Sequence, residues 1–172
     1  NNFSIGSPVL PEIYASCSSV DITNQITSNT VAPILYPLVI NYTVFAPDGS
    51  VAQNLSQPIS SGSASNLELL QNINLFGNQL FSVKIEVTDN CGNTFSEEFE
   101  INPNPKLIVQ QQTADCGELF FTVILTNYRP LFTLSFTAPT GFNPVSFNTN
   151  YPGPYQISPV TFGSIDNTIP FG

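Results

Sequence analysis

The chain has 172 residues, of which 41% are hydrophobic and only 9% are charged, and its formal net charge is −9. Charged residues make up roughly 25% of an ordinary soluble domain, so asparagine, glutamine, serine and threonine must supply most of the polar surface here. With only Lys84, Lys106 and Arg129 as cations, the chain lacks a basic patch for nucleic acid or anionic lipid, and no apolar run reaches the ~18 residues that membrane insertion requires.

Short strands are predicted throughout the first hundred residues. Proline and glycine separate the apolar runs, which predicts strands at 9–15, 20–26, 38–45, 51–56 and 67–73. The last of these has some helical character. The run 81–88 then alternates strictly between apolar and polar residues, which indicates a half-buried strand. After a turn at 89–93, the run 95–101 repeats the alternation, so the two runs are expected to pair as a hairpin.

The segment 102–105, Asn-Pro-Asn-Pro, is predicted to be a linker. Proline lacks an amide donor and favours extended backbone, so the joint should be short and stiff. It separates a first domain at 1–103 from a second at 104–172. In the second domain, strands are predicted at 106–111, 118–126, 131–137, 145–148 and 161–165.

Three landmarks recur in the same order, with a period of 92 to 99 residues. The second copies of Cys17, of Tyr36-Pro37-Leu38 and of Ala46-Pro47-Asp48-Gly49 begin at residues 116, 129 and 138. Solenoid repeats run roughly 20 to 50 residues, so this period is that of a whole domain. The second copy has no counterpart of the hairpin at 81–101. The predicted fold is therefore all-β, with tandem Ig-like antiparallel β-sandwiches of which the second is incomplete, and we expect the native chain to continue past residue 172.

The repeat also suggests how the three cysteines are used. Cys17 begins the first module and Cys91 lies in its last hairpin turn, so a Cys17–Cys91 disulfide is predicted. Cys116 corresponds to Cys17, and its partner should lie beyond the end of this chain. Reduced thiols in a cytosolic protein are the alternative. A metal site is disfavoured, because the chain has no histidine and no Cys-x-x-Cys pair.

Two clusters are candidate ligand sites. No cofactor is expected, but Asp89, Asn90 and Asn93 place oxygen ligands on one turn, which would suit calcium. Asp and Asn also occur in turns for backbone reasons alone. Tyr151 and Tyr155 lie on a proline-rich loop, where paired tyrosines can stack on a sugar ring. Packing of proline on tyrosine is the alternative.

Catalysis is not expected. A nucleophilic triad of the usual kind needs histidine, and the densest carboxylate cluster is Glu97, Glu98 and Glu100 on a predicted strand. Glu98 and Glu100 should lie on its outer, solvated face, where nothing would shift their pKa values or oppose them with a second carboxylate across a cleft.

The segment 81–94, Phe-Ser-Val-Lys-Ile-Glu-Val-Thr-Asp-Asn-Cys-Gly-Asn-Thr, resembles the closing strand pair of repeats in large cell-surface adhesins of gliding Bacteroidota. The cysteine-initiated start of each module, the Pro-Leu strand starts and the acidic, Lys-poor composition are similar to the same Ig-like or PKD-like repeats. The resemblance implies export by the type IX secretion system, display on the outer cell surface, and a role in adhesion or gliding motility.

We therefore expect a non-catalytic, extracellular structural or adhesion module. Its partners would be neighbouring modules of the same chain and cell-surface or substrate glycans and proteins. One alternative is a fimbrial or filament subunit whose second sandwich is completed by a donated strand. The other is a carbohydrate-binding accessory module of a secreted enzyme, which would use Tyr151 and Tyr155.

Overall fold

The fold is all-β, as predicted. The computed structural model describes residues 3–28, 35–60 and 65–170, and within them every regular element except two 3-10 turns is a β-strand. The chain forms two compact units. The first consists of Asn1–Pro11 with Ala15–Asn104, and the second of Glu12–Tyr14 with Pro105–Gly172. The boundary at residues 104/105 lies within the proline-rich segment identified as a linker.

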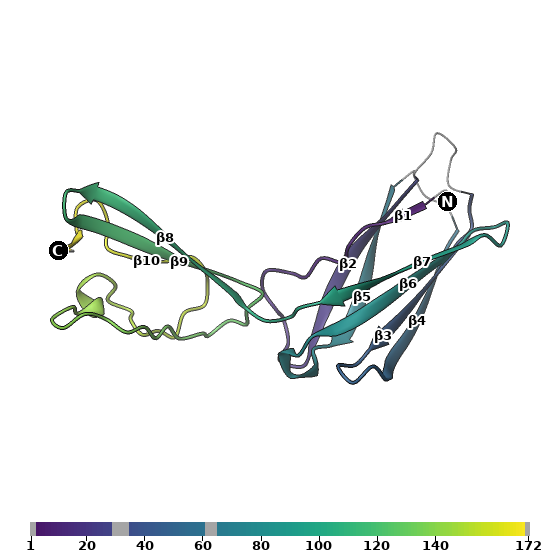
Figure 1. Cartoon of the computed structure of the whole chain (residues 1–172), viewed down its shortest axis with the longest axis horizontal. Helices are drawn as coiled ribbons and strands as arrows, with labels where there is room; N and C mark the ends of the chain where they lie inside the picture. Colours follow the sequence, from purple (N-terminus) through teal and green to yellow (C-terminus); the bar gives the residue numbers. More distant parts are fainter. Residues whose placement is uncertain (1–2, 29–34, 61–64, 171–172) are drawn as a thin grey trace. The chain divides into compact units, whose positions relative to one another are not determined.

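The first unit is a two-sheet antiparallel sandwich of the Ig-like kind (Figure 1). One sheet has the order β1-β2-β5 and the other the order β4-β3-β6-β7. The strands are β1 (Phe3–Ile5), β2 (Ser19–Ser28), β3 (Leu38–Phe45), β4 (Val51–Ile59), β5 (Ser65–Asn74), β6 (Phe81–Thr88) and β7 (Thr94–Ile101), and the 3-10 turn η1 (Phe76–Asn78) precedes β6. The stretch 67–75, whose sequence also allows a helical turn, lies in β5 except for Leu75.

The core of this unit follows from period-two alternation. Buried and half-buried residues alternate along β3 and β6, and the buried ones face each other across the sheet. Ile40 faces Val87 and Val44 faces Val83, and all four side chains are fully buried. Burying an aliphatic side chain of this size contributes about 1.5–3 kcal/mol, so the alternation alone fixes which face packs inward.

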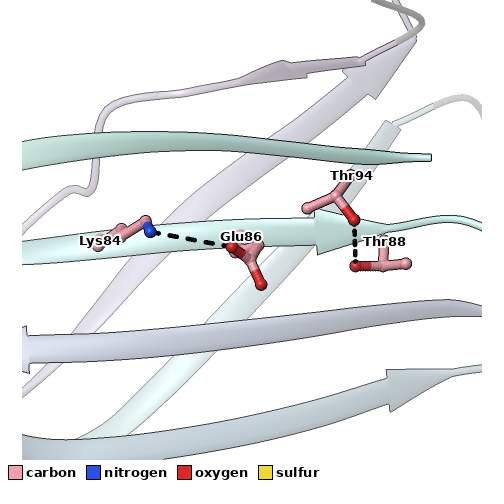
Figure 2. Close-up of polar contacts among 4 residues, drawn as sticks. All are labelled: Lys84, Glu86, Thr88 and Thr94. Carbon is pink, nitrogen blue, oxygen red and sulfur yellow. Dashed lines mark hydrogen bonds and ion pairs between the residues drawn. The ribbon is translucent and has the colours of Figure 1, made fainter. Parts of the chain in front are cut away.

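The opposite face of the same strands is polar. On β6, Lys84 Nζ lies 3.9 Å from a Glu86 carboxylate oxygen, and Thr88 hydrogen-bonds Thr94 of β7 at 3.1 Å (Figure 2). The two charged side chains are partly exposed, and exposed pairs contribute at most about 1 kcal/mol. This face is therefore a solvated surface, as the alternation predicted.

The second unit has one sheet, in which β9 is central. β8 pairs with one edge of β9, while β10 and β11 pair with the other. The strands are β8 (Lys106–Asp115), β9 (Glu118–Thr126), β10 (Val160–Phe162) and β11 (Ile169–Pro170). The segment between β9 and β10 supplies the rest of the core from an irregular loop, which includes the 3-10 turn η2 (Pro144–Ser146).

Aromatic rings dominate this second core. Phe162 of β10 is fully buried, stacks on Phe121 with ring centroids 5.0 Å apart, and meets Phe136 edge-on at 5.4 Å. Val123 of β9 and Leu134 of the loop complete its buried centre together with Tyr155, Val160 and Ile169. Because rings bury more area than aliphatic chains, a loop can cover a sheet face that a second sheet covers in the first unit.

Three predicted strands are wrong. The run 131–137 makes only a single bridge, Phe132 with Tyr155, and its amides are used by the loop, since Leu134 N–H donates to Pro152 O at 3.0 Å. The run 145–148 overlaps η2 instead. The run 9–15 makes isolated bridges at Val9 and Ile13. Each has strand-like residues, but none has a full-length neighbouring strand to pair with among the described residues.

The short segment Glu12–Tyr14 belongs to the second unit. Ile13 forms a parallel bridge with Tyr128, in which Tyr14 N–H donates to Tyr128 O at 2.7 Å and Tyr128 N–H to Glu12 O at 3.1 Å. The Arg129 guanidinium lies 5.4 Å from the centre of the buried Tyr14 ring. The chain therefore passes between the two units three times.

Candidate functional site

The predicted calcium cluster is a hydrogen-bonded hairpin turn. Asp89 is only 5% exposed, and its Oδ1 accepts from the amides of Cys91 and Asn93 at 2.8 and 2.9 Å. Its Oδ2 accepts from Asn93 Nδ2 at 2.9 Å. The side-chain hydrogen bond from Asn93, followed by those from backbone amides, holds the pKa of Asp89 below its usual value although burial opposes this.

These hydrogen bonds show that Asp89 and Asn93 stabilise the hairpin turn between β6 and β7. Both oxygens of Asp89 already accept from amide groups, while Asn90 and Asn93 are exposed. Among the residues that the structure describes, no group of three or more acidic, cysteine or histidine side chains is placed to hold a metal ion. Calcium binding by Asp89, Asn90 and Asn93 thus stays a prediction that none of these contacts favours.

The predicted Cys17–Cys91 disulfide is absent. Cys91 is an exposed free thiol, and so is Cys116, whose amide donates to Asp115 Oδ1 at 2.7 Å. Cys17 is also exposed. Topology gives the physical reason for the error. Ser18 O accepts from Leu75 N–H, which places Cys17 near the start of β6, whereas Cys91 lies beyond its end.

A strand of eight residues spans about 26 Å, and a disulfide requires Cα atoms within about 7 Å. The repeat established that each module begins with a cysteine. It could not show at which end of the sandwich the hairpin turn would lie.

Tyr151 and Tyr155, which were predicted to stack on a sugar, pack against other aromatic rings of the second unit. Tyr155 is only 9% exposed, its hydroxyl has no hydrogen-bond partner among the described residues, and its ring packs on Phe132 at 5.6 Å. Burial, with a smaller effect of Tyr151, raises the pKa of Tyr155 above its ordinary value. Tyr151 is half-buried and lies 5.1 Å from Phe136. Both rings therefore pack with the aromatic core, and carbohydrate binding by Tyr151 and Tyr155 stays a prediction that this packing does not favour.

The acidic cluster on β7 lies as expected from the sequence. Glu98 and Glu100 are exposed, and Glu98 accepts a 2.6 Å hydrogen bond from Ser82 Oγ on β6. Glu97 alternates with them and is half-buried. The three side chains do not converge, because neighbouring residues of a strand point to opposite faces.

The feature that sequence reasoning missed is the free edge of β8. Leu107, Ile108 and Val109 are 57%, 54% and 49% exposed. Beside this strand lies an open groove of about 740 Å³, whose wall is mostly apolar and includes Gln111, Leu119 and Phe121. The sequence predicted a strand at 106–111, but a strand prediction alone does not tell whether an edge of that strand stays unpaired.

Comparisons with known proteins establish no family. No family model matches the chain, and no curated protein matches it. Among solved structures, a Parabacteroides merdae beta-glucuronidase aligns with a TM-score of 0.41 and 12% identity over 70% of this chain. Two Bacteroides uniformis beta-glucuronidases align with a TM-score of 0.39, over 75% and 77% of this chain and at 12% and 13% identity. In each case the match spans about 15% of the glucuronidase chain.

None of the helical segments in the described part of the chain has the length and apolar character that a membrane span requires.

Proposed function

We propose that this chain is a non-catalytic structural module of a long extracellular surface protein, in which tandem β-units act as spacers or adhesive surfaces outside the cell. The proposal is supported by the tandem arrangement of two all-β units, by a sequence that is poor in charged residues and rich in amide and hydroxyl side chains, and by the resemblance of residues 81–94 to adhesin repeats.

The observation that carries the proposal is how the chain connects the two units. β7 ends at Ile101 and β8 begins at Lys106, so four residues lead from one sheet into the next. In addition, Glu12–Tyr14 leave the first unit and pair with Tyr128 in the second. A load that separates the units must therefore break hydrogen bonds besides straightening a linker, which suits a spacer.

The location and the role can be tested together in the organism that encodes the chain. External protease added to intact cells should degrade the protein, while a cytoplasmic marker stays whole. Deleting the segment should lower adhesion, and replacing it with an unrelated β-sandwich pair of similar length should restore it. Restoration would support a spacer role. If adhesion returns only with the original sequence, the surface itself binds the target, and an intact protein after protease treatment would overturn the extracellular assignment.

A filament subunit completed by a donated strand is the second candidate function, and the free edge of β8 beside an apolar groove favours it. Strand donation from one subunit to the next is head-to-tail and produces open polymers. Purified protein that forms long polymers, visible by electron microscopy, would favour this candidate over the spacer.

A further inference from the structure

Two edge strands of the first unit, β4 and β7, carry groups that discourage pairing with another chain, and the edge strand β5 has one charge, Glu68, in its sequence. β4 contains Pro58, which has no amide to donate, and β7 carries Glu97, Glu98 and Glu100. Charges and proline on edge strands are common devices against edge-to-edge association. In the second unit, β10 and β11 are protected by being only three and two residues long.

β8 lacks such protection. It has ten residues and contains no proline, and its only charges are Lys106 and Asp115 at its two ends. It pairs with β9 on one side and with no strand of the described residues on the other. All of its side chains are exposed except that of Ala114, which is half-buried. The one irregularity, a register shift between Thr113 and Asp115, leaves a regular stretch from Lys106 to Thr113.

We propose that the free edge of β8 pairs antiparallel with β8 of a second copy of this chain, forming a two-fold symmetric dimer with one continuous sheet. This inference is independent of the proposed function, because it rests only on the edge and its side chains.

The alternation of side chains restricts the register. Facing residues of an antiparallel pair point to the same face, so a symmetric pair must be centred on a residue. An axis at Gln110 places it opposite Gln110 of the second copy, with Val109 opposite Gln111 and Leu107 opposite Thr113. The extra residue at the register shift then brings Asp115 opposite Lys106 of the second copy.

The charges of the strand are complementary in this register. Lys106 of each copy faces Asp115 of the other, so the dimer contains two opposite-charge pairs and no like-charge pair along the edge. The surroundings also permit close approach. The second unit contains four carboxylates and two cations, a net charge of −2, while the first contains eight carboxylates and one lysine, a net charge of −7.

The apolar side chains fit the same register. Gln111 faces Phe121 of β9, and Thr113 faces Leu119. Gln111, Phe121 and Leu119 all line the apolar groove. Val109 and Leu107 of the second copy, which lie opposite Gln111 and Thr113, are therefore placed at the rim of this groove on its side of the sheet. The dimer would cover apolar side chains that are exposed in the single chain.

Charge reversal provides the first test. Lys106→Glu or Asp115→Lys replaces two attractive pairs with two repulsive ones, which should weaken the dimer about tenfold in sedimentation equilibrium under reducing conditions. An equimolar mixture of the two variants should regain affinity, because both pairs across a mixed dimer are attractive. The double variant should regain it too. A variant that merely misfolds would not be rescued by mixing.

Lys84→Glu and Asp166→Lys are the matched controls. They make the same changes in net charge at exposed positions away from β8, and they should leave the dissociation constant unchanged. If the controls weaken association as much as the β8 variants do, net charge and not edge pairing controls self-association, and the proposal fails.

A cysteine placed on the two-fold axis tests the register directly. In a chain with Cys17, Cys91 and Cys116 replaced by serine, Gln110→Cys should form an intermolecular disulfide, because facing Cα atoms of a strand pair lie about 4.5–5.5 Å apart. Gln112→Cys, on the same face two residues away, should not, since its two copies would be about 13 Å apart. Equal cross-linking of both would overturn the register. A wild-type chain that stays monomeric at all concentrations would overturn the dimer and leave the edge to a strand from a different protein.

Discussion

The two units of this chain close their cores in different ways. In the first, two sheets of long strands face each other, and the buried residues are mostly aliphatic, such as Ile40, Val44 and Ile85. In the second, one sheet is covered by an irregular loop, and the core is mostly aromatic, with Phe162 at its centre. The core of the first unit is closed by the pairing of long strands in two sheets. The core of the second unit is closed by large aromatic rings, several of which the loop contributes.

This difference extends to the edges. The sandwich carries most of the negative charge and has proline or glutamate on its long edge strands, whereas the single-sheet unit leaves β8 open. A second sheet covers an apolar face but leaves the sheet edges open, so the edges need proline, charges or short strands to discourage pairing. The edge of β8 has no proline and no charge between its two ends, and this edge is where a partner is expected.

The two cores are expected to unfold independently of each other. Phe162→Ala should destabilise the second unit by about 3–5 kcal/mol, because it leaves a cavity among packed rings. Hydrogen exchange should then accelerate in β8 and β9 while β3 and β6 stay protected. Ile85→Ala, which truncates a fully buried residue of the other core, should give the reverse pattern.

If both variants accelerate exchange throughout the chain, the units form one cooperative structure and their separate cores have no thermodynamic meaning. Two calorimetric transitions in the wild type, each shifted by only one of the variants, would establish independence.

The sequence predicted the sandwich well because its strands are half-buried. An apolar run between turn residues predicted a strand at 38–45, and period-two alternation predicted one at 81–88; β3 and β6 have these same bounds. The hairpin turn followed from Asp89 and Gly92, whose side-chain acceptor and positive φ suit a turn. These signals are local, so a single sequence reveals them.

The errors concern properties that depend on a distant partner. The segment 131–137 alternates like a strand, yet its Phe132 and Leu134 amides bond to the loop. Tyr151 and Tyr155 were expected on the surface because prolines surround them, and they pack inward because the second unit has no second sheet to fill its core. The predicted Cys17–Cys91 disulfide also depends on distant residues, because it requires both cysteines to lie at the same end of the sandwich.

Asn24 is a polar residue in the otherwise apolar core of the first unit. It is 2% exposed between the fully buried Ile22 and Ile26, and neither its Nδ2 nor its Oδ1 has a hydrogen-bond partner among the described residues. A buried unpaired amide costs about 1–3 kcal/mol, so Asn24→Leu should stabilise the unit by a similar amount in denaturant unfolding. Gln25→Leu, on the exposed side of the strand, should change stability by less than about 0.5 kcal/mol. A destabilised Asn24→Leu would mean that the amide is satisfied by a buried water.

Asp89 makes the stability of the first unit depend on pH. Its pKa is lower when folded, so its stabilising effect is fully present above the unfolded value of about 3.9 and is lost as the pH falls through the folded value. Thermal unfolding of the wild type should therefore lose stability below about pH 4. Asp89→Asn, which cannot ionise and presents an amide to Asn93 Nδ2, should be less stable at neutral pH and less sensitive to acid. Asp166→Asn is the control and should lose stability in acid as the wild type does. If it reduces acid sensitivity as much as Asp89→Asn does, the role of the turn is contradicted.

The smallest expected effect concerns where the second unit begins. The Arg129 guanidinium above the Tyr14 ring should contribute about 0.5–1 kcal/mol, which helps hold Glu12–Tyr14 beside Tyr128. Arg129→Ala should therefore accelerate hydrogen exchange at the amides of Tyr14 and Tyr128 by a few-fold while the Phe162 core keeps its protection. It should also raise the pKa of Tyr14, because burial already raises that pKa and the Arg129 charge opposes the rise. Arg129→Lys, which keeps the charge, should shift both readouts less. Unchanged exchange in Arg129→Ala would mean that the backbone hydrogen bonds to Tyr128 alone hold the segment. Aromatic contacts would then stabilise the core of the second unit but not Glu12–Tyr14.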